Sequence, residues 1–372
     1  MGRVMNTTIK SPVMNYARLM MIIAVFLSFV GIVFVYSSSS IYALEKIGRA
    51  DYFLRRQCLF MILGMIGFGA ALRIPLALYR HYSSLFYIGV IAFTAVTLGA
   101  QHGMMINGAA RWIKMGTLSL QPSELLAIAV LLFVAAHLAK ERVSGNVFTR
   151  YFSVALAVPF IVLLFQPDFG SAVTIASTVF LVIAIMSWQP VYALVAAGIG
   201  IPLIGLLVII APYRVNRIMT FLNPWNDPQG KGFQIIQSLI AIGSGGWWGR
   251  GLSFSNQKFF YLPMSHTDFI FSITAEEMGF VFSAFLVVLF FAFVALGLRM
   301  CFYVQDTFAR ALGLGCIIFI GLRSIINLMV TVGLLPTKGI GLPFISYGGS
   351  ALVCHLFMLG IILNVARTSA RS

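Results

Sequence analysis

The stretch LMMIIAVFLSFVGIVFV, residues Leu19–Val35, is almost wholly apolar and carries no charged residue. A helix that crosses the hydrocarbon core of a bilayer needs about 20 mostly apolar residues, and this run extends on both sides toward that length. It is too long for the hydrophobic centre of a signal peptide, and no small-residue cleavage site follows it. We therefore expect a helix over about 17–41 that is retained in the membrane.

The composition of the whole chain agrees with this first run. Of 372 residues, 60% are hydrophobic and 9% are charged, whereas a soluble domain carries about 25% charged residues. Such an apolar chain has too few polar residues to cover its core in water, so we predict that lipid surrounds it. The predicted fold is an all-α polytopic membrane protein with about ten transmembrane helices, near 17–41, 54–73, 82–101, 123–139, 151–166, 170–187, 190–211, 268–298, 308–332 and 350–366.

The net charge of +15 would suggest nucleic acid as the partner of a soluble protein. Here the basic residues lie in short loops between apolar runs, where membrane topology and anionic lipid account for them. Their distribution at the span ends predicts that both termini are cytoplasmic. The cysteines, Cys58, Cys301, Cys316 and Cys354, have neither metal-ligand spacing nor an obvious disulfide pattern, and we predict no protein-held metal.

A long loop over about 212–267 separates the seventh and eighth spans and is predicted to be extracytoplasmic. It is rich in proline and glycine, but a loop of this length is either disordered or a functional structure. Its aromatic residues argue against disorder. Within it, Gln234–Ile242 is predicted to form a short interfacial helix.

Asp268 lies where this loop meets the eighth span, directly after His266 and Thr267. One interpretation is a helix N-cap, a position for which aspartate is well suited. The other is a general base at the membrane surface. A helix N-terminus lowers the pKa of a carboxyl group, whereas burial raises it, and the sequence leaves this balance open.

Other charged residues lie within or beside the spans, where each needs a partner or a watery cavity. Glu276 is predicted to face the same cavity as Asp268, about 80° around the helix and about 12 Å deeper. The alternative is a structural role for Glu276 and Glu277 as a buried pair. Arg323 lies inside the ninth span. Asp168, in the break between the fifth and sixth spans, is either a turn residue or part of a cavity.

Five motifs match one family in order along the chain. The sequence resembles the SEDS (shape, elongation, division, sporulation) family, and the resemblance implies one membrane domain over residues 1–372 with ten helices and a large extracytoplasmic loop. The motifs are GAARWI at 108–113 with QPSE at 121–124, QPDFG at 166–170, NPWNDP at 223–228, HTDFIF at 266–271 with EExG at 276–279, and LPTKG at 335–339 with LPFISYGGS at 342–350.

The resemblance also implies an activity, peptidoglycan glycosyltransfer from lipid II during septal cell-wall synthesis. The residues near 257–263 and 336–340 favour the division-type branch over the elongation-type branch. The family's essential acid falls on Asp268, the predicted catalytic residue. Predicted substrate-binding residues in the matching motifs are Arg111, Lys114, Glu124, His266, Thr267, Glu276, Lys338 and Ser346.

No cofactor is assigned with certainty. Arg111, Lys114, Lys338 or a divalent cation, Mg or Mn, would stabilise the charge on the leaving pyrophosphate. The resemblance implies a class B penicillin-binding protein, an FtsI-like transpeptidase, as partner, along with other divisome membrane proteins. The expected location is the bacterial inner (plasma) membrane at the division septum.

The chain departs from the family pattern at two positions. Ala127 stands where the family often has lysine, and Arg323 stands where it often has glutamine. A positive charge is lost from the fourth span and gained in the ninth. We therefore predict that Arg323 supplies the counter-charge to Glu124 or to a neighbouring acid.

Two other classes of function compete with the enzyme. A lipid II flippase would suit polar residues at depth and a broken fifth and sixth span. However, the chain has no visible inverted repeat, and its most polar motif lies at the outer surface. A scaffold for the transpeptidase would leave the acid at Asp268 unexplained beyond capping.

Overall fold

The structure is a computed structural model that describes residues 12–99, 104–106, 109–115, 118–140, 156–187, 194, 198, 200, 202, 205–259, 262–263 and 265–370. Six of the helices in these ranges are long and apolar enough to cross a membrane, namely α1 (Pro12–Ile47), α2 (Tyr52–Arg73), α6 (Phe169–Ser187), α10 (Ile270–Phe302), α11 (Thr307–Thr331) and α12 (Gly349–Ser369). The prediction of a polytopic membrane protein is confirmed.

Three further helices fall on predicted spans. They are α3 (Leu76–Gly99), α4 (Pro122–Leu138) and a short apolar helix over Leu156–Phe165. The predicted seventh span, 190–211, lies mostly outside the described residues. The expected count of ten therefore stays a prediction, although every other predicted span coincides with a helix.

The loop between the seventh and eighth spans is more ordered than a plain loop. It contains α8 (Pro212–Leu222), a short 3-10 helix η1 (Pro224–Asn226) and α9 (Phe233–Ser244). The helix predicted over Gln234–Ile242 is confirmed as α9. Helix α8 was not predicted, because its segment was interpreted as part of a proline- and glycine-rich loop; its apolar residues recur at helical spacing, but none of its residues is buried.

A small antiparallel sheet, also missed, lies between α3 and α4. Its strands are β1 (Met104–Ile106), β2 (Ala109–Met115) and β3 (Leu118–Leu120), in the order β1-β2-β3. Ser350, at the start of α12, accepts a hydrogen bond from Gln121 N (2.9 Å) and donates one to Ser119 O (3.2 Å). These bonds fix the end of the sheet against α12.

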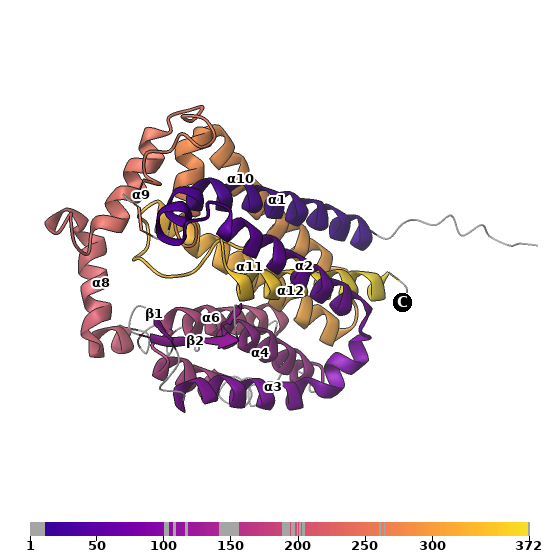
Figure 1. Ribbon diagram of the computed structural model, residues 1–372. Helices are drawn as coiled ribbons and strands as arrows, with labels where there is room; N and C mark the ends of the chain where they lie inside the picture. The colour runs from indigo at the N-terminus through magenta and orange to yellow at the C-terminus, as the bar shows by residue number, and fades with distance from the viewer. Residues whose placement is uncertain are drawn as a thin grey trace, which may run out of the picture.

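The helix ends fall into two groups. Tyr16, near the start of α1, stacks on Tyr303 after α10 at 6.1 Å. Asn364, near the end of α12, donates to Ala71 O in α2 (2.9 Å). Figure 1 shows the C-terminus at this end and α8 and α9 at the opposite end. Asp268 belongs to the opposite end, since the neighbouring Ser265 donates to Ser38 O, late in α1 (3.2 Å).

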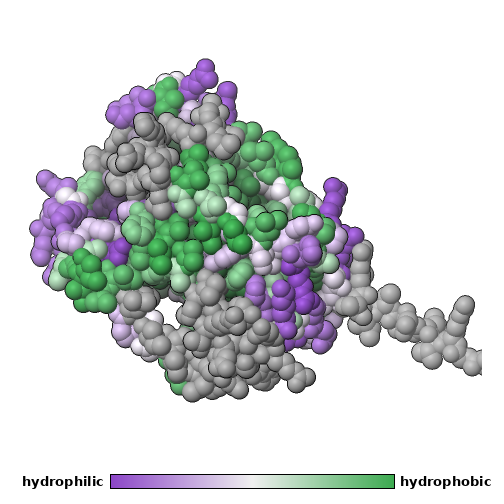
Figure 2. Space-filling model, turned by 90° about the horizontal axis from the view of Figure 1, so that it is seen from below, coloured by the Kyte–Doolittle hydropathy of each residue, from purple (hydrophilic) through white to green (hydrophobic). Residues whose placement is uncertain are grey.

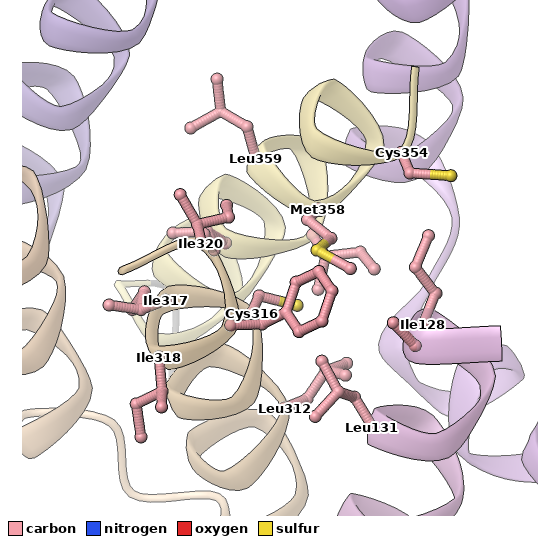
Figure 3. Packing of buried hydrophobic residues seen from close by; sticks show 14 of the residues in the cluster. Ile128, Leu131, Leu312, Cys316, Ile317, Ile318, Ile320, Cys354, Met358 and Leu359 are labelled. Carbon is pink, nitrogen blue, oxygen red and sulfur yellow. The ribbon is translucent and has the colours of Figure 1, made fainter. Parts of the chain in front are cut away.

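The core lies where α4, α11 and α12 meet. Figure 3 shows Ile128 and Leu131 of α4 facing Cys316 of α11 and Met358 of α12. Almost every residue of α4 is buried, which is typical of a helix surrounded by other helices. By contrast, Figure 2 shows a broad hydrophobic area across the middle of one face with hydrophilic residues gathered toward its margins, as expected of a surface in contact with lipid.

Helix α10 is broken at Gly279, where φ is 76°. The loop after α9 repairs this break with its own backbone. Arg250 N and Gly251 N donate to Glu276 O and Glu277 O (3.0 and 2.9 Å), and Phe280 N donates to Gly246 O (2.8 Å). In a membrane protein, irregular backbone survives only where protein or water satisfies it. The glycine-rich segment 245–251 is therefore part of the helical bundle.

The close approach at this break predicts that Gly249→Ala is strongly destabilising. Gly249 has φ of 80°, and an added Cβ would collide with the backbone of Glu277 and Met278. We expect the free energy of unfolding to fall by about 2–4 kcal/mol, from backbone strain and overpacking together.

The matched control is Gly243→Ala in α9, because an added Cβ there meets nothing within 4 Å. Alanine also favours a helix over glycine by about 1 kcal/mol, so this variant should be neutral or stabilised. Unfolding of both variants in detergent is the measurement. Equal stability of the two variants would contradict the close packing at the break.

Candidate active site

Asp268 does not cap the helix that follows it. Helix α10 begins at Ile270, its N-cap is Phe269, and no side chain caps it. Asp306 shows the contrast, since its Oδ1 accepts a hydrogen bond from Ala309 N (2.8 Å) at the start of α11. Among the described residues, no hydrogen bond or ion pair reaches the Asp268 carboxylate. The N-cap interpretation is wrong, and this carboxylate is left without a structural role.

The surroundings of Asp268 alter its acidity. The side chain is half-buried at the outer end of α10. Burial raises the pKa of Asp268 to about 7, although the positive charges of Arg323 and Arg217 act to lower it. A carboxyl group with a pKa near neutral pH exchanges its proton readily under cellular conditions, which suits a general base.

The backbone of the Asp268 turn is held by three successive carbonyl groups. His266 O accepts from Tyr347 N (3.0 Å), Thr267 O from Ser346 Oγ (2.6 Å) and Asp268 O from Asn327 Nδ2 (2.8 Å). All three donors come from α11 or from the loop between α11 and α12. The turn is therefore fixed while its acidic side chain stays unpaired.

Ser346 and Asn327 each make a second bond. Ser346 Oγ accepts from Leu342 N (2.7 Å), and Asn327 Nδ2 donates to Ile340 O (2.7 Å). Ser346 holds the Asp268 turn through these bonds, and its predicted contact with substrate stays a prediction. The position of Asn327 one turn after Arg323 was visible in the sequence, but its partners depend on a distant loop.

The loop between α11 and α12 also brings Lys338 and Gly339 to the site. A Cβ added at Gly339 would lie 3.4 Å from Asp268 Oδ2, so this backbone faces the carboxylate directly. The Lys338 side chain packs against Gly170, in the first turn of α6 directly after the break. Burial lowers the pKa of Lys338 to about 8. The structure thus joins Asp268, Lys338 and the break in one place.

His266 lies in an aromatic cluster. Its ring centroid is 4.5 Å from that of Phe53, 5.7 Å from Tyr347 and 5.9 Å from Tyr42. Burial lowers the pKa of His266 to about 4, so the imidazole is neutral near pH 7 and offers no positive charge to a substrate. Thr267 is half-buried, and its predicted contact with substrate stays a prediction.

Glu124 and Arg323 form a buried ion pair between α4 and α11, which confirms the predicted pairing. A cavity beside the pair is lined by Ser123, Ser171, Thr174 and Ile340. Among the described residues, Arg323 Nε and Ser123 Oγ are buried without a hydrogen-bond partner. Ile175 and Phe319 also line the cavity, which adjoins the Lys338 loop through Ile340.

Glu276 and Glu277 anchor the outer loop. Glu276 accepts from Ser255 Oγ and Asn256 N (3.0 Å), and Glu277 accepts from Ser37 Oγ (2.7 Å) and pairs with Lys258 (3.4 Å). Glu276 was predicted to face the Asp268 cavity and bind substrate. The structure instead gives it the alternative role of a buried structural acid, because the loop occupies its carboxylate.

The remaining predicted residues divide into two groups. Asp168 caps α6 by accepting from Ser171 N (3.2 Å) and Ser171 Oγ (2.8 Å), as a turn residue would. Arg111 and Lys114 belong to strand β2, but their side chains lie outside the described residues, and their roles stay predictions. Arg217 was not predicted from the sequence as a site residue. Its guanidinium donates to Thr337 O (3.4 Å), directly before Lys338.

Comparisons with known proteins identify the family of the chain. Residues 17–371 match the family model of FtsW, RodA and SpoVE, described as "Cell cycle protein". The chain is 39% identical over 355 residues to the "Probable peptidoglycan glycosyltransferase FtsW" of Geobacter metallireducens, covering 95% of each chain. It is 38% identical over 359 residues to the stage V sporulation protein E of Bacillus subtilis, covering 94% of this chain and 97% of that one.

Two solved structures share the fold. A chain of a peptidoglycan synthase complex that coordinates polymerization and crosslinking aligns with a TM-score of 0.77 at 28% identity, over 95% of this chain and 98% of that one. The rod shape determining protein RodA of Thermus thermophilus aligns with a TM-score of 0.70 at 25% identity, over 94% and 95% of the two chains.

The buried ion pair generates a stability prediction. Arg323→Gln leaves Glu124 as an uncompensated buried charge, and we expect the free energy of unfolding to fall by about 3–5 kcal/mol. Adding Ala127→Lys should restore most of this loss, because residue 127 lies one turn after Glu124 on α4. The measurement is unfolding of the single and double variants in detergent.

The control is Ala127→Lys alone, with Arg323 intact. That variant adds a second buried cation to a paired acid, so it should be less stable than the wild type. An Arg323→Gln variant as stable as the wild type would show that Glu124 does not need a counter-charge.

Proposed function

The chain belongs to the FtsW, RodA and SpoVE family of cell cycle proteins and is a peptidoglycan glycosyltransferase, and we propose that it polymerises lipid II with Asp268 as its general base. The observation that carries the residue assignment is the unpaired, half-buried carboxylate of Asp268 with a pKa raised to about 7. The matching relatives that carry the name FtsW favour a role in septal wall synthesis during division.

The proposed reaction joins two lipid-linked sugars. Asp268 removes the proton from the C4 hydroxyl of the acceptor lipid II as that oxygen attacks the anomeric carbon of the donor glycan. The bond between the anomeric carbon and the diphosphate oxygen breaks, and the lipid diphosphate leaves with the bonding electrons. Inversion at the anomeric carbon gives a β-1,4 link. Ser346 and Asn327 hold the turn so that the carboxylate faces the acceptor.

Negative charge develops on the leaving diphosphate and needs stabilisation. Lys338 is placed for this beside Gly339, and Arg111 and Lys114 stay candidates from the motif match. A divalent cation, Mg or Mn, is the alternative. In the part of the chain that the structure describes, no three metal-ligating side chains cluster.

The partner and the orientation complete the proposal. A similar chain occurs in a peptidoglycan synthase complex that couples polymerization to crosslinking. We propose that this chain likewise assembles with a class B penicillin-binding protein and with other divisome proteins. The start of α1 and the end of α12 lie at the end of the molecule opposite Asp268 (Figure 1). This placement supports termini and a catalytic site on opposite sides of the membrane, and we propose that the termini are cytoplasmic and the site is extracytoplasmic, at the septum.

The proposal predicts that Asp268→Asn abolishes polymerisation of lipid II by the purified protein with its partner, while the fold and partner binding remain. In the wild type the rate should rise with pH through about 7, because only the deprotonated Asp268 accepts a proton. The measurement is glycan strand formation across a pH series.

Asp306→Asn is the matched control, since asparagine caps a helix as well as aspartate does, and it should remain active. Wild-type polymerisation by Asp268→Asn would refute the general-base assignment. Transfer of lipid II across the bilayer without any polymer would support a transporter instead.

A further inference from the structure

Helix α8 is unusual among the described helices because none of its residues is buried. Figure 1 shows it lying across the outer end of the bundle, away from the end that holds the C-terminus. Its two arginines, Arg214 and Arg217, are three residues apart and so share one face of the helix. Packing into a core therefore does not explain why this helix lies where it does.

Both arginines reach inward to the elements that form the candidate site. Arg217 Nη1 donates to Thr337 O (3.4 Å), directly before Lys338 and Gly339. The Arg214 guanidinium lies 4.4 Å from the ring centroid of Phe169, the residue before Gly170, on which Lys338 packs. Arg217 therefore contacts the loop whose Gly339 faces Asp268, and Arg214 contacts the start of α6 beside it.

These cations have no acidic partner. Among the described residues, the ion pairs within 4 Å join Arg55, Arg250, Lys258 and Arg323 to carboxylates. Arg214, Arg217 and Lys338 take part in none of them. Cations from two separate elements, Arg217 of α8 and Lys338 of the loop, thus lie in the neighbourhood of Asp268, and Asp168 is the acid whose charge acts on Lys338.

We propose that Arg217 and Arg214 of α8 bind, together with Lys338, the diphosphate group of a polyprenyl-diphosphate-linked sugar and hold it beside Asp268. This inference rests on the proposed function and names the residues that receive its leaving group. Arginine suits this task because its planar fork donates two hydrogen bonds to a phosphate. The exposure of Arg217 leaves its donors accessible to a ligand arriving from the membrane surface.

A phosphate on α8 has a second potential source. The helix also exposes apolar residues, including Met219 and Leu222, and an amphipathic basic helix binds the headgroups of anionic lipids. Both ligands present phosphate oxygens to arginine. The position of Arg217 favours the diphosphate substrate, because Arg217 contacts the loop that holds Lys338 and Gly339.

The binding test uses the full-length protein in phosphatidylcholine nanodiscs, with Asp268→Asn as the background to prevent turnover. Undecaprenyl diphosphate and undecaprenyl monophosphate are the probes. Arg217→Gln should weaken binding of the diphosphate at least about tenfold and reduce its advantage over the monophosphate, since one charge-assisted contact is worth about 1.5–3 kcal/mol. Arg217→Lys should lose less affinity for the diphosphate, because lysine keeps the positive charge.

Lys231→Gln is the matched control, an exposed cation of the same outer loop, and it should bind both probes as the parent does. Unchanged affinity of Arg217→Gln for the diphosphate would overturn the proposal. So would a loss confined to binding of phosphatidylglycerol vesicles, which would assign α8 to the lipid surface. Because this assay needs no catalysis, it is independent of whether Asp268 is the base.

A kinetic readout separates a binding role from a structural one. The charged groups that act on the Asp268 carboxylate are Arg323 of α11 and Arg217 of α8, and the neighbouring His266 is neutral near pH 7. Since Arg217 acts to lower the pKa of Asp268, Arg217→Gln should shift the acidic limb of the pH–rate profile to higher pH. The KM for lipid II should rise as well. An unshifted profile with unchanged KM would contradict the placement of Arg217 in the site.

Discussion

Three backbone carbonyls in succession, at residues 266 to 268, accept hydrogen bonds from donors in α11 and the loop after it. Buried carbonyls need such partners, and here the partners come from a distant part of the chain. Because these bonds fix the turn, α10 begins only at Ile270 and its N-cap is Phe269. The Asp268 side chain therefore does not cap α10, and its carboxylate is available to accept a proton.

The acidic residues of the bundle differ in whether their carboxylate oxygens have hydrogen-bond or ion-pair partners. Glu124 pairs with Arg323, Asp168 caps α6, and Glu276 and Glu277 hold the outer loop. An acid at membrane depth is tolerated when it is paired, and these four serve the fold. Asp268 lies at the surface end of its helix without a partner, which is costly for stability but suits a group that must accept a proton.

How much of this could be predicted depended on the range of the interactions involved. The apolar runs predicted the spans and α9 from local sequence alone. The acidic partner of Arg323 was predicted because a guanidinium inside the membrane requires a counter-charge. The sequence could not separate the cap from the base at Asp268, since the answer lies in bonds from Ser346 and Asn327. Glu276 was misplaced for the same reason, because its partners are in a loop. Helix α8 was missed because it lies in a proline- and glycine-rich segment that was interpreted as a loop, although its apolar residues recur at helical spacing.

The proposed mechanism requires that Asp268 is an unpaired carboxylate with a pKa near neutral pH. The most direct test is an isotope-edited infrared titration of protein carrying 13C-labelled aspartate, comparing wild type with Asp268→Asn. The account predicts one aspartate band that titrates near pH 7 in the wild type and is missing in the variant. If the Asp268 band titrates instead near the ordinary aspartate value of about 3.9, the carboxylate is solvated or paired, and the account is contradicted.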